Sequence, residues 1–378
     1  MPAPTRVSPA QAAGIARREY GVRGHAQRLA AELDDVFRLT AADGSVRLLR
    51  IGLATAGIGL ATAEKDAAPQ AGQSAGAGLL SLPTAVLVHL AAVAPGLPVQ
   101  RVVPAEDGRL EVPWEEDGHP RLVRMTTWLD GELLSQGDCT AGLRRDLGAT
   151  LGRLNIALRG FRHPGARRTH RWDLQNFCGL GPLLAELPAG GVLPEIGQVL
   201  AADGSWPPRP PWPAGGLRAE LADCLDRFGA VVVPRLARTP VQIVHTDFHG
   251  ENLLTDGERI TGILDFGDAL TGPVAMDLGV AACYQLGRGP DLLAPALDVV
   301  AGYHAADPLG PGDLDLAAEF MLARVAARII VSQWNAVREP ANRGYLLRRT
   351  PQAITQFAAL RRLTPDETGA RLRAACGM

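Results

Sequence analysis

The sequence predicts an α+β fold of two lobes, a small β-rich amino-terminal lobe and a larger helical carboxy-terminal lobe. Alternating and β-branched segments lie mainly before residue 128, and segments with helical spacing dominate from about residue 135 onward. Between the later helical segments, residues 241–270 change to a pattern of short strands and polar loops. We therefore expect a domain of residues 1–128 followed by a domain of residues 129–378.

The first domain is expected to begin with a helix at 8–20, followed by a small, mostly antiparallel sheet that carries one helix, at 82–95. The Ala-Asp-Gly sequence at 42–44 is a turn signal between two of the strands. Residues 53–82 are rich in Ala, Gly, Gln, Ser and Thr, and we interpret them as an atypical, poorly packed insertion. The expected strands lie at 24–29, 36–39 and 45–52, and within 98–114 and 119–131.

The second domain contains one especially clear amphipathic helix, at 139–161. Its leucines recur at three- and four-residue steps, which is the spacing of an α-helix with one buried side. These leucines are Leu143, Leu147, Leu151, Leu154 and Leu158. A second helix is expected at 217–236, after a proline-rich loop at 203–216, and helices return after residue 270.

The composition is that of a globular protein, with 47% hydrophobic and 21% charged residues. The formal net charge of −2 gives no long-range attraction to nucleic acid or to an anionic membrane, so neither partner is expected. The five cysteines form no Cys-x-x-Cys pair, which favours free thiols in a reducing cytoplasm over a zinc site.

Two short polar segments after the second helix carry the residue types that phosphoryl transfer requires. Asp247 would accept or orient the proton of an attacking hydroxyl group. Asn252 would offer an amide oxygen to Mg²⁺, and Asp265 would offer a carboxylate. The Thr-Asp-Gly turn at 255–257 predicts a hairpin that returns Asp265 to the side of Asn252. The order His-x-Asp, four residues, Asn and then Asp-Phe-Gly fits the pattern of kinases.

The segments VHTDFHGENLL (244–254) and GILDFGDALTGPVAMDLGVAACY (262–284) resemble the aminoglycoside-phosphotransferase and choline-kinase superfamily. Within it, the chain is most similar to the hydroxylysine-kinase-like branch, which includes kinase domains fused to class III aminotransferases. The resemblance spans roughly residues 18–350 and fails mainly at 53–82 and 200–216. It implies a bilobal protein-kinase-like fold with ATP between the lobes. The first domain would then bind the nucleotide, and the second would hold the catalytic and acceptor-binding residues.

The resemblance also implies roles for individual residues. Asp247 is implied to be the catalytic aspartate, with Asn252 and Asp265 as the Mg²⁺ ligands. The hinge against the adenine is implied to consist of Met125, Thr126, Thr127 and Trp128.

Five further residues have both a functional and a structural interpretation. His249 and Asp277 would brace the catalytic loop, with plain packing as the alternative, and His249 is also a candidate substrate-contacting residue. Asp268 would face a substrate ammonium group or act as a cap. Trp172 and Asp173 would line the acceptor pocket or serve in packing.

The resemblance breaks at the residue that pairs with the α- and β-phosphates. The family has a lysine there and this chain has Arg50, while the following helix contains no acid to pair with it. Arginine is not equivalent, because its planar fork prefers bidentate oxygen partners. In one interpretation, Arg50 still holds the phosphates with Glu32 or Glu64 as its partner. In the second, Lys65 takes over, and in the third the small lobe is degenerate and binds nucleotide weakly.

We therefore expect an enzyme, a kinase that uses Mg²⁺ and ATP or GTP to phosphorylate a hydroxyl group of a small amine, amino acid or specialised metabolite. One alternative is a pseudokinase that binds a partner without turnover. Another is a kinase whose acceptor is a peptide hydroxyl. Residues 130–240 contain no acidic cluster, so a cationic aminoglycoside is not favoured as the acceptor.

Overall fold

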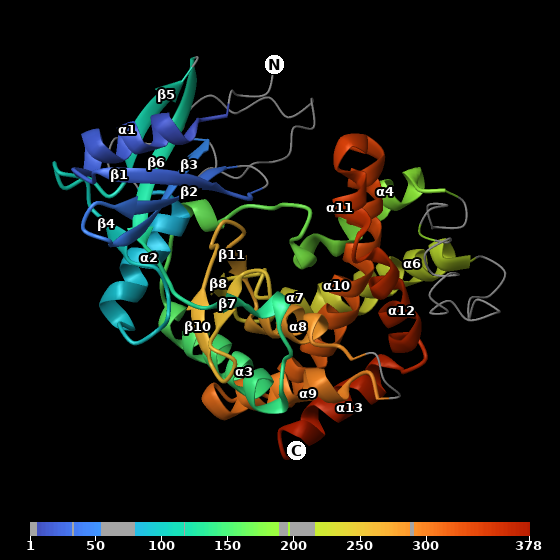
Figure 1. Cartoon of the computed structure of the whole chain (residues 1–378). Coiled ribbons are helices and arrows are strands. Elements are labelled where there is room, and N and C mark those ends of the chain that lie inside the picture. The colour runs from blue at the N-terminus through green and yellow to red at the C-terminus, as the bar shows by residue number, and fades with distance from the viewer. Residues whose placement is uncertain are drawn as a thin grey trace.

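The computed structural model describes residues 6–31, 34–53, 80–116, 118–188, 196, 216–287 and 291–378. Figure 1 shows a sheet-rich amino-terminal part beside a larger, mostly helical part, which confirms the predicted α+β class. The predicted insertion at 53–82, except for its ends, lies outside the described residues. The proline-rich segment at 203–216 also lies outside them, except for Gly216.

The amino-terminal sheet is antiparallel in every described strand pair, as predicted. Its strands follow the order β1-β2-β3-β6-β4, and β5 also pairs with β6. They are β1 (Gly24–Leu29), β2 (Asp35–Ala41), β3 (Val46–Leu53), β4 (Val102–Val103), β5 (Val112–Glu116) and β6 (His119–Thr127). Because side chains alternate along a strand, Leu49 and Met125 enter a core on one face, whereas Arg50 and Arg124 lie on the other.

Helix α1 (Pro9–Tyr20) covers the first of these faces. Ser8 and Gln11 form a capping box at its start, and Gly21 ends it in the left-handed region at φ 64°. Ile15 is 1% exposed and packs with the apolar side chains of the sheet. This small core is separate from the main core of the protein.

Helix α2 (Leu82–Val93) lies between β3 and β4 in the sequence but packs into the main core. Leu82, Leu87 and Leu90 belong to the same apolar cluster as Leu147 of the helical part. The two cores are therefore not divided at residue 128, because part of the chain before that residue belongs to the main core. That domain boundary stays a prediction.

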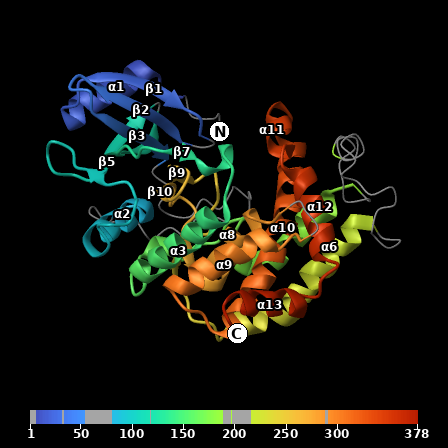
Figure 2. The same cartoon turned by 60° about the horizontal axis from the view of Figure 1, so that its bottom comes forward.

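The helical part is built around α10 (Pro311–Arg338), whose middle is buried. Figure 2 shows it among α8, α12 and α13, with α3 and α9 side by side. The other helices are α3 (Ala141–Leu158), α4 (Gly181–Glu186), α6 (Gly216–Arg227), α7 (Val233–Leu236), α8 (Val274–Tyr284), α9 (Ala294–Ala306), α11 (Arg343–Leu347), α12 (Thr350–Leu360) and α13 (Pro365–Ala375). Short 3₁₀ segments lie at Leu134–Gln136, Pro164–Ala166, Leu174–Leu180 and Pro340–Asn342.

The two predicted helices of this part have different outcomes. The predicted helix at 139–161 is α3, and its five spaced leucines are at most 1% exposed. The predicted helix at 217–236 is divided, because a π-helical segment, Phe228–Val232, separates α6 from α7. Pro234 has no amide to continue the α-helical hydrogen bonds, which accounts for the break.

Short strands hold the polar loops in place. They are β7 (Glu132–Leu133), β8 (Gln242–Val244), β9 (Leu253–Thr255), β10 (Ile260–Ile263) and β11 (Leu270–Gly272). β9 and β10 form the hairpin that the Thr-Asp-Gly turn predicted, and β7 pairs with β9. β8 pairs with β11. The loops at 245–252 and 264–269 therefore start and end on short, mostly buried strands.

All five cysteines lie within the described residues, and none of them forms a disulfide, as expected. In the described part of the chain, none of the helices combines the length and the apolar character of a membrane span.

Candidate functional site

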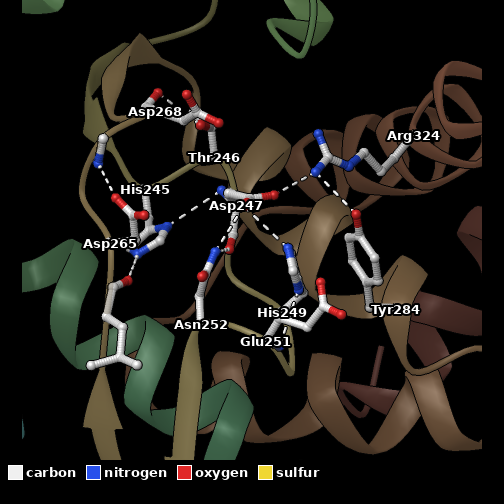
Figure 3. A network of polar contacts seen from close by, with 12 residues as sticks. His245, Thr246, Asp247, His249, Glu251, Asn252, Asp265, Asp268, Tyr284 and Arg324 are labelled. Atoms are coloured by element: carbon white, nitrogen blue, oxygen red, sulfur yellow. Dashed lines mark hydrogen bonds and ion pairs between the residues drawn. The ribbon is translucent and has the colours of Figure 1, made fainter. Parts of the chain in front are cut away.

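The loop after β8 has an uncommon backbone conformation. Thr246 has a φ of 67°, in the left-handed region that a β-branched residue rarely adopts. The buried carboxylate of Asp277, in the first turn of α8, accepts the amides of His245 at 3.1 Å and Thr246 at 2.7 Å. The Thr246 hydroxyl donates to the carbonyl oxygen of Asp268 at 2.9 Å. These bonds hold the backbone immediately before Asp247. Figure 3 shows Thr246 and Asp268 beside Asp247.

Asp247 lies at the centre of the polar network in Figure 3. Its Oδ2 accepts from Asn252 Nδ2 at 2.7 Å and from His249 Nε2 at 3.1 Å. Its Oδ1 accepts from Arg324 Nη2 at 2.5 Å. The ring of His249 donates through Nε2 because its Nδ1 accepts the amide of Glu251. Each oxygen of Asp247 is therefore oriented by a named donor.

Burial and charge act in opposite directions on Asp247. Burial by itself raises the pKa of a carboxyl group, because it disfavours the charged form. The hydrogen bond from His249 and the charge of Arg324 help to outweigh this effect, and the pKa of Asp247 lies well below its ordinary value. Asp247 is therefore a carboxylate at neutral pH and can accept a hydrogen bond from a hydroxyl group.

Asn252 and Asp265 lie at the two ends of the β9–β10 hairpin. The amide of Leu264 donates to the carbonyl oxygen of Asn252 at 2.8 Å, which ties the two ends together. Asn252 Nδ2 donates to two oxygens of Asp247, so its side-chain oxygen is directed away from them. Asp265 has a φ of 53°, and its Oδ1 accepts the amide of Gly267 at 2.9 Å. An amide oxygen and a carboxylate are suitable ligands for a hard divalent cation.

Arg50 extends from β3 to Asp265. Its Nη1 and Nη2 each lie 3.4 Å from one oxygen of that carboxylate, and Nη1 also lies 3.2 Å from Asp34 Oδ2. The charge of Arg50 is the main cause of a lowered pKa of Asp265. Burial has the larger effect on Asp34 and raises its pKa despite the attraction of Arg50. Arg50 thus joins the amino-terminal sheet to the loop after β10.

The three interpretations of Arg50 stay open. Glu32, Glu64 and Lys65 all lie outside the described residues. Within the described ranges, the acids that pair with Arg50 are Asp34 and Asp265, and neither was expected as its partner.

The segment expected to face the adenine is the end of β6. Met125 is 0% exposed, and its side chain packs in the small core under α1. Thr126 is 1% exposed on the opposite face, and its hydroxyl has no hydrogen-bond partner among the described residues. Thr127 ends the strand, and the ring of Trp128 lies 5.3 Å from the guanidinium of Arg38. The hinge role of this segment stays a prediction.

Trp172 and Asp268 lie next to the network around Asp247. The ring of Trp172 lies 4.6 Å from the guanidinium of Arg324, the same group that binds Asp247. Asp268 contributes its carbonyl oxygen to the loop, while its carboxylate has no hydrogen bond among the described residues. Burial, together with the nearby carboxylates, raises the pKa of Asp268. Both residues are close enough for an acceptor role, which stays a prediction.

Asp173 has the contacts of a structural residue. It is 5% exposed, and its Oδ1 accepts the amide of Gln175 at 3.0 Å at the start of a 3₁₀ segment. It also borders an open cavity of about 560 Å³ that Arg168 and Thr271 help to line. Its role as the cap of this 3₁₀ segment accounts for its burial. Its role in the acceptor pocket stays a prediction.

The sequence-based interpretation missed Arg324. Its side chain is 2% exposed in the middle of α10, and Nη2 also donates to the hydroxyl of Tyr284 at 3.1 Å. The ring of Tyr284 stacks on His249, with 4.4 Å between the centroids. An arginine inside the apolar run of α10 was the available signal, because a buried charge requires a partner.

Residues 25–316 match the model of the phosphotransferase enzyme family. Hydroxylysine kinase of Danio rerio is 25% identical over 289 residues, which cover 73% of this chain and 74% of that protein. The predicted resemblance is thereby confirmed.

Two solved structures show the same fold at low identity. One is amicoumacin kinase hAmiN in complex with AMP-PNP, Ca²⁺ and Ami, with a TM-score of 0.59, 16% identity, and coverage of 95% of this chain and 98% of that one. The other is the microcompartment-associated aminopropanol kinase, with a TM-score of 0.57, 18% identity, and coverage of 94% and 98%.

Proposed function

This chain belongs to the phosphotransferase enzyme family, and we propose that it transfers the γ-phosphoryl group of ATP or GTP to a hydroxyl group of a small amine, amino acid or specialised metabolite. The observation that carries the proposal is a hydrogen-bonded cluster. In it, Asn252 binds Asp247, and the β9–β10 hairpin brings Asp265 next to Asn252. Hydroxylysine kinase and aminopropanol kinase, two of the similar proteins, are named for small hydroxylated amines.

Asp247 would orient the attacking hydroxyl group and accept its proton. Its side chain is 22% exposed, so a hydroxyl group can approach it from the solvent side. His249 and Arg324 keep it charged and fixed in direction. Phosphoryl transfer depends mainly on such positioning, because it requires little covalent work from the protein.

Asn252 and Asp265 would hold Mg²⁺, since they supply an amide oxygen and a carboxylate from adjacent loop ends. The Asp265 side chain is 41% exposed and therefore accessible to a cation. When bound, Mg²⁺ would neutralise charge on the phosphates. Arg50, which pairs with Asp265 in this structure, would contact the phosphates.

Asp268 supports an acceptor that carries an ammonium group. Its carboxylate is without a hydrogen bond among the described residues, and its raised pKa reflects burial beside other carboxylates. A cation placed there would relieve that repulsion. The five free cysteines support the reducing cytoplasm as the place of this activity.

Asp247→Asn is the direct test, because it keeps the size of the side chain and removes its negative charge. We expect turnover with Mg²⁺ and ATP or GTP to fall at least about 100-fold across a panel of amino alcohols and hydroxy amino acids. The nucleotide should still raise the melting temperature. Asp43→Asn, in the exposed β2–β3 turn, is the matched control and should keep full activity. Undiminished turnover in Asp247→Asn would refute the role of Asp247.

A pseudokinase is the second candidate, and the specific observation in its favour is Arg50. This residue replaces the expected lysine and is engaged by Asp265 in the structure. If millimolar Mg·ATP and Mg·GTP both leave the melting temperature of the wild-type protein unchanged, this second candidate is favoured. Adding hydroxyl-bearing peptides to the acceptor panel tests the remaining alternative, a peptide kinase.

A further inference from the structure

We infer that Arg124 is a second phosphate-binding residue, which lies opposite Arg50 and is positioned by Thr84 and Glu111. The inference rests on the proposed function, because it assigns the polyphosphate chain of the nucleotide to this pair of arginines.

The two arginines lie side by side on one face of the sheet. Arg50 on β3 is directly opposite Arg124 on β6 in the antiparallel register, so their side chains leave the same face. The neighbouring residues Leu49 and Val123 are 0% exposed in the core on the other face. Since Arg50 contacts Asp265, this face of the sheet is directed toward the candidate metal ligands.

A chain of hydrogen bonds positions Arg124. Its Nη1 donates to the hydroxyl oxygen of Thr84 at 2.7 Å, and that hydroxyl donates to Glu111 Oε1 at 2.5 Å. The other oxygen of Glu111 accepts the amide of Ser81 at 2.8 Å, at the start of α2. A carboxylate at a helix amino terminus is favourable, because unpaired amides and the helix dipole meet it there. Glu111, from the segment before β5, thus anchors both α2 and Arg124.

The charge of Arg124 is less well balanced than that of Arg50. Among the described residues, Arg50 pairs with two acids, whereas Arg124 donates to the neutral hydroxyl of Thr84. Arg124 Nε is buried and has no hydrogen-bond partner among the described residues. Burial, followed by the charge of Arg50, lowers the pKa of Arg124 to about 10, so the group stays protonated at neutral pH.

Two like charges directly opposite each other in a sheet repel, and an anion between them removes that cost. A guanidinium binds phosphate oxygens through parallel donors, and two guanidinium groups side by side suit an anion that has more than one phosphoryl group. The chemistry that fits the pair is therefore the polyphosphate chain of a nucleoside triphosphate. Arg124 would supply a phosphate contact whose position is fixed by Thr84. Arg50 would supply a second phosphate contact in place of its pairing with Asp265.

Calorimetric titrations with Mg·ATP and with adenosine can distinguish a phosphate-binding role of Arg124 from a structural role in supporting α2. If the wild type binds GTP more tightly, Mg·GTP and guanosine are the probes. Arg124→Met should weaken triphosphate binding at least about 10-fold, the scale of a charge-assisted hydrogen bond, and change nucleoside binding less than about twofold. Arg124→Lys should be intermediate. Arg47→Met is the matched control, because Arg47 lies on the neighbouring strand β3 and on the opposite face of the sheet, and this variant should bind both ligands normally.

The possible results distinguish this inference from the proposed function. Undiminished triphosphate binding in Arg124→Met overturns the inference, and so do equal losses for triphosphate and nucleoside. A wild-type protein that binds neither triphosphate overturns the proposed function itself. If Arg124→Met does not fold, Thr84→Val provides the same comparison, because it keeps the side-chain volume and removes the positioning hydroxyl. A selective loss of triphosphate binding in Thr84→Val supports the inference, and unchanged binding contradicts it.

Discussion

Asp247 and Arg324 form the most closely placed charge pair of the site, and Arg324 reaches it from the middle of a helix. Removing one partner of a buried pair leaves the other charge uncompensated. Arg324→Met should therefore lower kcat at least about 10-fold and lower the melting temperature, and Arg324→Lys should restore part of both. Steady-state kinetics at saturating nucleotide and thermal unfolding check these expectations.

Arg328→Met is the control for Arg324→Met. Arg328 lies one helical turn farther along α10, and its hydrogen bonds go to Cys283 and Gln356 rather than to Asp247. It should lose stability but keep kcat. Equal loss of kcat in the two variants would show that general damage to α10, and not the contact with Asp247, is the cause.

Asp35 links stability to pH. Its carboxylate is 2% exposed and binds Arg28 at 2.5 Å, Arg121 at 2.8 Å and the amide of Val7 at 3.1 Å. Burial alone would raise its pKa, but these bonds lower the pKa below its ordinary value. The unfolded chain therefore binds the proton more tightly than the folded chain does. The stabilisation is complete above the ordinary value of about 3.9 and is lost as pH falls below it.

Urea unfolding from pH 7 to pH 3 tests this linkage. The wild-type free energy of unfolding should fall below about pH 4, and Asp35→Asn should show a smaller fall. The variant should also be less stable at pH 7 by about 3 kcal/mol, because Arg121 loses a buried partner. Parallel pH profiles for the two proteins would contradict the assignment to Asp35.

At the residue scale, local spacing predicted some of the site. Asp247 and Asn252 are five residues apart on one loop, so their spacing alone brings them together. Only the tertiary fold brings to the site the residues Arg324, Asp34 and Glu111. No short sequence motif predicts such contacts.

Helices α3 and α9 are in backbone contact through a glycine on each. A Cβ on Gly148 would overlap the carbonyl oxygen of Val299, and one on Gly302 would overlap that of Arg145. Gly148→Ala should therefore lower the free energy of unfolding by about 1–3 kcal/mol despite the better helix propensity of alanine. Gly14→Ala, in α1 with no atom within 4 Å of the new Cβ, should raise it by up to about 1 kcal/mol.

Chemical denaturation of the two glycine variants and the wild type provides the comparison. Because both substitutions add the same methyl group within a helix, the difference between them isolates the contact of α3 with α9. If Gly148→Ala were as stable as Gly14→Ala, the close approach of the two helices would be wrong.

At the element scale, strong periodicity and turn chemistry predicted α3 and the β9–β10 hairpin. The packing of α2 was not predictable, because Leu82–Val93 is apolar on nearly every side and its pattern does not indicate which core it enters. The break between α6 and α7 had a signal in Pro234, but the apolar spacing continued past it.

The whole molecule is joined across the predicted domain boundary. The segment after α2 is tied to the hairpin, since the amide of Ile263 donates to the carbonyl oxygen of Pro98 at 2.7 Å. Residues 1–128 expressed alone should therefore expose Leu87 and Leu90 of α2, bind a hydrophobic dye and lack a cooperative melt. A soluble monomeric fragment with a sharp transition would contradict this expectation.

The α+β class was predictable because it depends on which type of element dominates each half of the chain. The domain boundary stays a prediction, and α2 shows why sequence order alone does not fix it, because this helix follows the first strands in sequence but shares its core with the helices. Sequence order and packing order differ at α2 and at the segment that follows it, which also contributes Leu97 and Val99 to the main core.

Thr246, immediately before Asp247, and Asp265, a candidate metal ligand, both have left-handed backbones, at φ 67° and 53°. Glycine would adopt these conformations without torsional cost, but it would remove the Thr246 hydroxyl and the Asp265 carboxylate. Glycine substitutions in these two loops should therefore raise the melting temperature and lower the rate of turnover. Laboratory evolution that selects only for thermal stability should therefore accumulate glycine at these positions and yield a more stable but inactive protein.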